Sequence, residues 1–163
     1  MTDEKTSQTI DVLSLCNGTA FPHVNAPDNT VALGLFGHGA YIQLTGSQLF
    51  APFDGHVINI SPTCHTLTLR ALNGLVLRIA FTPNVQSLMG LKFRRHSKNK
   101  HKISSGQCLL DFDINLLKQN VGIPGIAVTI LNPLKSIELH TNHADKGRKI
   151  VALSDTLMTV CLK

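Results

Sequence analysis

The stretch TCHTLTLRALNGLVLRIAFTPN, from Thr63 to Asn84, carries the strongest fold signal in the sequence. Two runs of alternating apolar residues flank Asn73-Gly74 in its middle. Asn-Gly between such runs favours a two-residue hairpin turn, because both central residues of that turn need a positive φ. The stretch therefore predicts two adjacent antiparallel β-strands.

The turn also predicts a register for this hairpin. A two-residue turn places His65 opposite Thr82 and Leu67 opposite Ala80, with all four side chains on one face of the sheet. His65 and Ala80 are then diagonal neighbours at roughly 7–8 Å, a separation that long side chains can bridge and alanine cannot. A bulge or a longer turn would shift this register.

Similar short apolar runs, each close to a turn signal, recur along the rest of the chain. They include AYIQL, LFAPF, HVINI, QCLLDFD, GIAVTIL, KIVAL and LMTVCLK. Only DINLLKQN (113–120) and VQSLMG (85–90) have helical spacing, and both are short. The pattern predicts an all-β fold, either an antiparallel β-sandwich or a distorted barrel, with short helical turns.

The composition indicates one domain. The chain has 163 residues, of which 43% are apolar and 15% charged, so it can build a core of its own. We expect residues 1–12 to form a flexible tail and residues 13–163 to form a single β domain. The polar start contains no apolar signal segment, and no apolar run is long enough to cross a membrane. Four cysteines without C-x-x-C spacing indicate reduced thiols, which favours a cytoplasmic location.

Positive charge is concentrated in the segment KFRRHSKNKHK (92–102) of a chain whose net charge is +5. This segment could bind nucleic acid, an anionic membrane or an acidic protein, or form a solvated loop, which is the interpretation we favour. Nucleic acid is poorly supported, because Phe93 is the only nearby aromatic residue that could stack on bases. The basic residues of the segment are Lys92, Arg94, Arg95, Lys98, Lys100 and Lys102.

The segment GHGAYIQLTGSQLFAPFDGHV (37–57) resembles the signature of the glucose-type enzyme IIA domain of the bacterial phosphoenolpyruvate-dependent sugar phosphotransferase system. The shared features are a Gly-x-Gly strand, a threonine-glycine turn and the motif Ala-Pro-x-Asp-Gly followed by x-Ile or x-Val. The similarity continues through TCHTLTL, NGLVLRIAF, SSGQCLLDFD and GIAVTILN, and covers about residues 16–163. The resemblance implies the family's all-β, duplicated-hybrid-like sandwich fold.

The resemblance also implies a site. Members of this family receive a phosphoryl group on a histidine from a small phosphocarrier protein and pass it to a sugar-transport component. Two of their histidines face each other in a shallow apolar depression, and the first, supporting one matches His65. The acceptor histidine begins the motif His-Phe-Gly-Ile-Asp-Thr, which is AFTPNV here, so Ala80 stands at the acceptor's position. Alanine offers no nucleophile to receive a phosphoryl group.

These residues lead to the hypothesis of a degenerate enzyme IIA homologue, not an enzyme itself, that acts as a protein-binding or regulatory module. Its binding surface is expected around the former site, at Phe36, His38, Phe81 and Asn84. Expected partners are proteins of the phosphotransferase system or a regulated target, including peripheral contact with a membrane transporter. Two alternatives are an active phosphocarrier that uses His65 and a nucleic-acid-binding protein that uses the basic segment 92–102.

Metal and cofactor sites are not expected. His38, His56 and His65 could approach one another if the family fold holds, but no H-x-x-x-H or C-x-x-C spacing supports a zinc site. Asp111 and Asp113 follow a strand closely, and we interpret both as structural, with Asp113 capping the helix after it.

Overall fold

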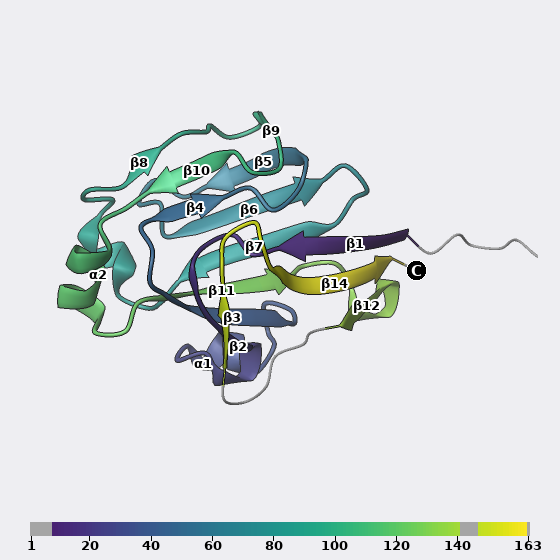
Figure 1. The fold of residues 1–163 in the computed structure, drawn as a ribbon, viewed down its shortest axis with the longest axis horizontal. Helices are drawn as coiled ribbons and strands as arrows, with labels where there is room; N and C mark the ends of the chain where they lie inside the picture. The colour runs from purple at the N-terminus through teal and green to yellow at the C-terminus, as the bar shows by residue number, and fades with distance from the viewer. Residues whose placement is uncertain (1–7, 141–146, 163) are drawn as a thin grey trace, which may run out of the picture.

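The computed structural model describes residues 8–140 and 147–162. In these ranges the chain forms three antiparallel sheets, with short helices between some of the strands (Figure 1). The strands are β1 (Gln8–Leu13), β2 (Gly18–Pro22), β3 (Gly39–Leu44), β4 (Gln48–Phe50), β5 (Gly55–Ile60), β6 (Thr66–Ala71), β7 (Val76–Phe81), β8 (Arg94–Arg95), β9 (Lys102–Ile103), β10 (Cys108–Asp111), β11 (Gly125–Ile130), β12 (Ile137–His140), β13 (Arg148–Ile150) and β14 (Thr156–Leu162). The α-helices are α1 (Asn29–Ala32) and α2 (Ile114–Val121), and 3-10 helices form at His23–Asn25, Val85–Leu88 and Leu134–Ser136.

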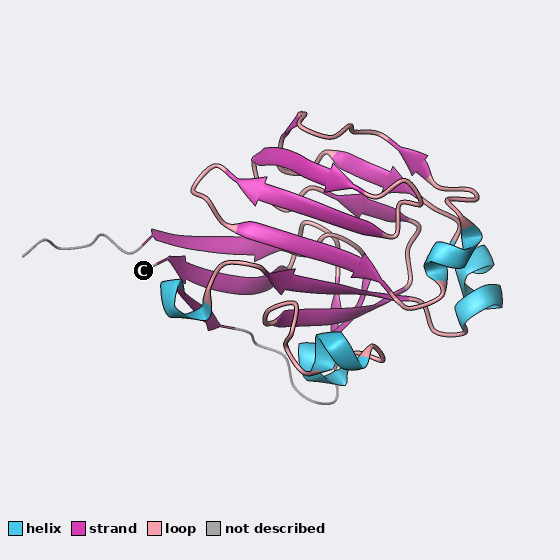
Figure 2. Ribbon diagram, turned by 180° about the vertical axis from the view of Figure 1, so that it is seen from behind, coloured by secondary structure: helices cyan, strands magenta, loops and turns pink. Residues whose placement is uncertain are grey.

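The largest sheet has eight strands in the order β13-β2-β3-β11-β7-β6-β5-β9. Two smaller sheets, β1-β14-β12 and β4-β10-β8, pack with it. The helices lie at the margins of this body of strands (Figure 2). Over the described residues the sheets stay open, so the predicted all-β sandwich is confirmed and the barrel alternative is not what forms.

The eight-stranded sheet has two different faces at its centre. On β6 and β7, the side chains of Leu67, Leu77 and Ile79 are fully buried in the main core. Thr66 and Ala80, which lie opposite each other in the register, point to the other face. A smaller apolar cluster on that second face includes the segment that carries α1. Most residues of the main core are Leu, Ile, Val or Ala. This agrees with the low aromatic content of the chain.

The β6–β7 hairpin does not have the predicted two-residue turn. The N–H of Ala71 donates to the carbonyl of Leu75 at 2.8 Å, and the N–H of Gly74 donates to the carbonyl of Ala71 at 3.0 Å. Gly74 has a φ of 94°, in the left-handed region that favours glycine. The loop therefore holds three residues, 72–74, and closes with a left-handed glycine, which is the next most common hairpin geometry.

The extra loop residue makes the predicted register wrong by one position. Ala80 lies opposite Thr66 and not opposite Leu67. The N–H of Phe81 donates to the carbonyl of His65 at 2.9 Å, so Phe81 takes the place expected for Thr82. Because side chains alternate along a strand, Leu67 points into the core and Ala80 to the second face.

The predicted tail of residues 1–12 is too long. Gln8–Leu13 forms β1 and pairs with β14, from Gln8 opposite Leu162 to Leu13 opposite Thr156. Residues 8–12 therefore belong to the domain, and residues 1–7 lie outside the described part of the chain. The alternation of QTIDVL is imperfect, and pairing with a strand about 150 residues away supplies the partner that local sequence cannot show.

Helix α2 begins where the sequence predicts. Oδ1 of Asp113 accepts hydrogen bonds from the N–H groups of Asn115 at 2.9 Å and Leu116 at 3.1 Å. Two of the unpaired N–H groups of the first turn are thereby satisfied. Leu117 buries the apolar side of the helix in the main core. The predicted capping role of Asp113 is confirmed.

Replacing this cap tests the account of α2. Asp113→Ala is expected to lower the free energy of unfolding by about 1 kcal/mol, because the helix loses its side-chain cap. Asp113→Asn, which can accept the same bonds, should stay close to the unmodified protein. Urea unfolding followed by far-UV circular dichroism measures both variants. Equal stability of the alanine variant and the unmodified protein would contradict a stabilising cap.

Candidate functional site

Ala80 lies near the middle of the largest sheet. Its strand neighbours in the register are Thr66 on β6 and Ala127 on β11, and Ala127 in turn lies opposite Tyr41 on β3. Positions 80 and 127 both carry the small side chain of alanine, which does not rise above the larger residues around it. Ala80 is therefore only 8% exposed. The position that the resemblance assigns to the acceptor is therefore the floor of a hollow.

The hollow above Ala80, which we call the Ala80 depression, is bounded by the segment before α1. Pro27, Tyr41, Thr82 and Pro83 line both the recess over Ala80 and a wider cavity beside it. The wider cavity has a volume of about 610 Å³. Its further lining residues are Asn25, Gln43, Asn84, Val121, Gly122 and Ile123. The depression is shallow and largely apolar, as the resemblance implies.

His65 lies just before β6, after a kink in the backbone. Cys64 has a φ of 59° and its side chain is buried in the main core, so it does not face the depression. Nδ1 of His65 is hydrogen-bonded to the hydroxyl of Thr63 and lies 3.3 Å from the hydroxyl of Ser61. One ring nitrogen of His65 is thereby held in place. Partial burial lowers the pKa of His65, and the positive charge of Arg78 lowers it further.

Arg78 lies two residues before Ala80 on β7 and so shares its face of the sheet. The guanidinium carbon lies 3.8 Å from the centre of the Phe36 ring, a cation–π contact. Burial lowers the pKa of Arg78, and the charge of Asp28 opposes this shift. Nη1 of Arg78 and the hydroxyl of Thr129, the residue opposite it on β11, are buried without a hydrogen-bond partner among the described residues. Nothing in the sequence pattern indicates a role for this arginine.

The histidines that could have formed a metal site lie apart. The ring of His38 stacks on that of His23, with centroids 4.7 Å apart. Nδ1 of His23 accepts a hydrogen bond from the N–H of Gly39 at 3.3 Å, and burial followed by the charge of His38 lowers the pKa of His23. His56 lies in β5 opposite Arg70, at the far end of β6 from His65. In the described ranges, His38, His56 and His65 do not form one set of ligands.

The residues expected at the binding surface have different environments. Phe81 is 6% exposed and packs edge-on against Phe93 and Phe112 within the main core, so its ring is committed to the core although the residue borders the recess over Ala80. Phe36 is half-buried over Arg78. Asn84 is exposed and lines the wider cavity at a φ of 77°. The surface prediction therefore depends on residues 36, 38 and 84 and not on Phe81.

The segment before β3 adds exposed apolar residues that the sequence analysis did not select. Leu33 is 75% exposed and Leu35 is 71% exposed. Both lie between α1 and Phe36, beside the apolar cluster on the second face. In the sequence these residues form a short apolar run with a glycine, just before the Gly-x-Gly motif. That run could have drawn attention to them, but only the fold shows that the two leucine side chains face outward.

The basic segment lies away from the depression. Its basic side chains are exposed. The segment runs from just before β8 to β9, along one edge of the molecule (Figure 1). The loop is anchored by Asn99, whose Oδ1 accepts from the N–H of Ile60 at 2.8 Å, and by the N–H of Lys100, which donates to the carbonyl of Val57 at 2.7 Å. Phe93 stacks on Phe112 and is not free to stack on a base.

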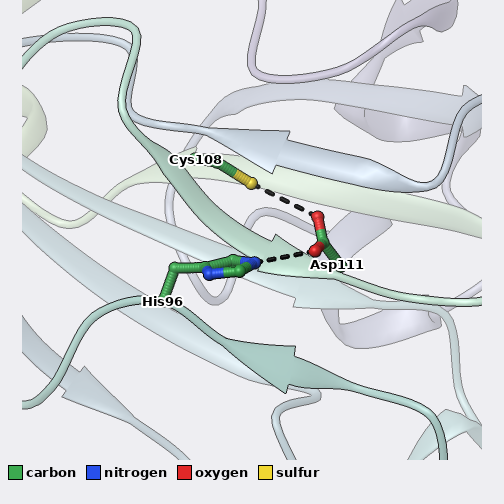
Figure 3. Close-up of side chains that lie close together, drawn as sticks. All are labelled: His96, Cys108 and Asp111. Carbon is green, nitrogen blue, oxygen red and sulfur yellow. Dashed lines mark hydrogen bonds and ion pairs between the residues drawn. The ribbon is translucent and has the colours of Figure 1, made fainter.

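A third group, His96, Cys108 and Asp111, was also not predicted (Figure 3). Nε2 of His96 lies 2.7 Å from Oδ2 of Asp111, and Sγ of Cys108 lies 3.4 Å from Oδ1 of Asp111. Burial, and then the hydrogen bond and negative charge of Asp111, raise the pKa of Cys108 to about 11. The hydrogen bond from His96 is the main reason why the pKa of Asp111 is lowered.

The fold is an antiparallel sandwich with a largely apolar depression whose floor is Ala80. Residues 10–135 match the family described as phosphoenolpyruvate-dependent sugar phosphotransferase system, EIIA 1. The chain belongs to this family, and its domain is of the glucose type.

Individual relatives agree with this assignment. The chain is 26% identical over 157 residues to the glucose-specific EIIA component of Borreliella burgdorferi, covering 95% of this chain and 83% of that protein. It is 29% identical over 141 residues to the mannose-specific EIIBCA component of Corynebacterium glutamicum, covering 86% of this chain. The chain spans only 20% of the length of that larger protein and of the glucoside-specific EIICBA component of Staphylococcus carnosus.

The solved structure of glucose permease IIA from Mycoplasma capricolum has the same fold. Its TM-score is 0.83 at 18% sequence identity, and the match covers 93% of this chain and 96% of that one. No helix in the described part of the chain is long and apolar enough to cross a membrane.

The lowered pKa of His65 can be measured directly. We expect NMR titration of the ring Cε1–H to give a value below 6.5, and Arg78→Met to raise it without reaching 6.5, because desolvation is the larger cause. Arg78→Lys, which keeps the charge, is the control. Since the folded pKa lies below the unfolded one, this contribution to stability is complete above pH 6.5 and is lost as pH falls through the folded pKa. A pKa at or above 6.5 in the unmodified protein would contradict this environment.

Proposed function

We propose that this chain is a degenerate glucose-type enzyme IIA protein that binds partners at the Ala80 depression without carrying a phosphoryl group. The observation that supports the proposal is the side chain at position 80. A phosphohistidine relay needs an imidazole nitrogen that can attack the incoming phosphorus. Ala80 places a methyl group on the floor of the depression instead, between Thr66 and Ala127, which offer no imidazole either.

The surroundings of the depression suit docking better than chemistry. Leu33 and Leu35 are exposed apolar side chains beside Phe36, and the cavity next to Ala80 is lined largely by apolar groups. Exposed apolar groups gathered at one site are characteristic of protein–protein contact surfaces. The partner we propose is the phosphocarrier protein of the phosphotransferase system or a transporter component, acting in the cytoplasm.

Incubation with phosphoenolpyruvate, enzyme I and the phosphocarrier protein tests the loss of the acceptor. Intact-mass spectrometry at alkaline pH, which preserves phosphohistidine, is expected to find no phosphoryl group on the unmodified chain. Ala80→His should gain one such group, because it places an imidazole at the position that the resemblance assigns to the acceptor. A fully modified active enzyme IIA domain serves as the positive control.

A phosphoryl group on the unmodified chain would contradict the proposal, and His65 is the residue to examine next. One observation favours this alternative: Nδ1 of His65 is held by Thr63, and its pKa is lowered toward a neutral ring. Those are two properties that a phosphoryl acceptor needs. Loss of the added mass in His65→Ala, with retention in His38→Ala, would establish an active phosphocarrier that uses His65.

The docking surface has its own test. Leu35→Asp is expected to weaken binding of the phosphocarrier protein at least about tenfold, since a charge on an apolar contact must be desolvated. Leu72→Asp is the matched control, because Leu72 is similarly exposed but lies in the β6–β7 loop. Isothermal titration calorimetry measures both variants. Equal effects of the two substitutions would contradict a specific surface beside the depression.

Nucleic-acid binding through segment 92–102 remains the less favoured alternative. The basic side chains are exposed, but Phe93 is committed to a stack with Phe112. Binding that falls steeply with salt and disappears when Arg94, Arg95 and Lys98 are neutralised would support it.

A further inference from the structure

We propose that His96, Cys108 and Asp111 form a binding site for Zn²⁺ on the sheet β4-β10-β8. Their ligand atoms all lie within 4.8 Å of one another, and Figure 3 shows the three side chains turned toward a common point. They come from β10 and from the residue that follows β8. The site is separate from the Ala80 depression, since no residue of it lines that hollow.

A β-bulge places two of the three ligands on the same side. Residues three apart in a regular strand point to opposite faces. In β10, however, Cys108 pairs with Phe50 while Leu110 pairs with Leu49, so one extra residue, Leu109, is inserted. Because of the bulge, the consecutive residues Leu109 and Leu110 are both buried. Cys108 and Asp111, on either side of them, lie on the same side of the strand, with Sγ and Oδ1 in contact. Bulges commonly re-aim a side chain in this way, next to functional sites in particular.

The third ligand is fixed by the neighbouring strand. The N–H of His96 donates to the carbonyl of Leu109 at 2.9 Å, which holds the histidine beside the bulge. Nε2 of its ring then reaches Oδ2 of Asp111 at 2.7 Å. Nε2 of Gln48, on β4, donates to Oδ1 of Asp111 at 3.2 Å and orients the carboxylate from outside the ligand set.

The distances suit a tetrahedral ion. Bonds of about 2.0–2.3 Å to nitrogen, oxygen and sulfur separate neighbouring ligand atoms by about 3.4–3.6 Å. The Sγ–Oδ1 distance of 3.4 Å already matches. The three ligand atoms all lie within 4.8 Å of one another, so the imidazole needs to shift by only about 1 Å as the ion replaces its hydrogen bond to Asp111. Water would complete the coordination.

The donor types select the metal. One thiol, one imidazole and one carboxylate are the ligands of Zn²⁺, whereas Mg²⁺ and Ca²⁺ require sets of oxygen ligands. With the Cys108 proton released to solvent, the thiolate and the carboxylate neutralise the charge of the ion. A neutral site matters here because two positive side chains are close: Arg94 lies opposite Asp111 and Arg95 lies opposite Leu110 in the neighbouring strand. A site with a net positive charge would be repelled by both of them.

A catalytic cysteine fits the same residues less well. A nucleophilic thiol needs a base within hydrogen-bond reach, usually a histidine. The polar side chain nearest to Sγ of Cys108 is the carboxylate of Asp111, and His96 contacts the other oxygen of that carboxylate. Asp111 therefore separates the thiol from the imidazole, an arrangement that suits a shared ion.

Cobalt titration of the reduced, chelator-treated protein tests the site. We expect one equivalent of Co²⁺ to produce a thiolate-to-cobalt charge-transfer band and the intense visible bands of tetrahedral cobalt, with Zn²⁺ displacing both. The charge-transfer band arises only when a cysteine thiolate binds the cobalt. Cobalt bound to histidines elsewhere in the protein therefore does not contribute to it. Cys108→Ser should abolish it, and His96→Gln and Asp111→Asn should abolish the stoichiometric tetrahedral spectrum.

Matched variants separate this site from others. Cys161→Ser should leave the spectrum unchanged, because that half-buried thiol lies on β14. His65→Ala should also leave it unchanged, because the ring of His65 is hydrogen-bonded to Thr63 and is not one of the three ligands. Gln48→Leu should weaken cobalt binding about tenfold, the effect typical of a lost outer hydrogen bond. No charge-transfer band, or a band that survives in Cys108→Ser, would overturn the proposal. Circular dichroism confirms that each variant is folded.

Discussion

The alternation of side chains along β7 is the constraint on which the site depends. β7 is held between β6 and β11, so its register is fixed from both sides. Leu77, Ile79 and Phe81 fill the main core, and a slip of one residue would move all three out of it. The same constraint directs Arg78 and Ala80 to the second face. The side chain at position 80 can therefore differ without disturbing the main core, of which it is not a part.

Much of this fold could be predicted, because hairpin signals and alternating runs are local. The strands at 66–71, 76–81 and 125–130 and the cap of α2 are of this kind. The hairpin register was wrong because Asn-Gly suits both two- and three-residue loops, and local sequence does not distinguish them. β1 was missed because its stability comes from pairing with β14 at the other end of the chain.

The residues of the candidate sites also fall into two groups, those that local sequence indicates and those that only tertiary structure brings together. Ala80 and His65 are candidates because a motif resemblance aligns them residue by residue. Arg78 could not be selected from sequence, since its ring contact with Phe36 and its buried nitrogen without a hydrogen-bond partner among the described residues are both set by tertiary structure. The group of His96, Cys108 and Asp111 depends on a bulge that places residues three apart on one side. Phe81 is adjacent to position 80 in sequence, but alternation along β7 directs its ring to the main core.

The charge of the depression follows from these placements. A phosphoryl group on a histidine adds a charge of roughly −1.5 to −2, to which docking partners can respond. Under the proposed function that change does not occur at position 80, and the positive charge of Arg78 beside Phe36, partly offset by Asp28, contributes to the local potential instead. Because opposite charges attract across an interface and like charges repel, the charge of Arg78 favours an anionic group on a partner. The proposed partner, a phosphorylated carrier protein, has such a group, so under the proposed function the depression would hold the donor of the relay without discharging it.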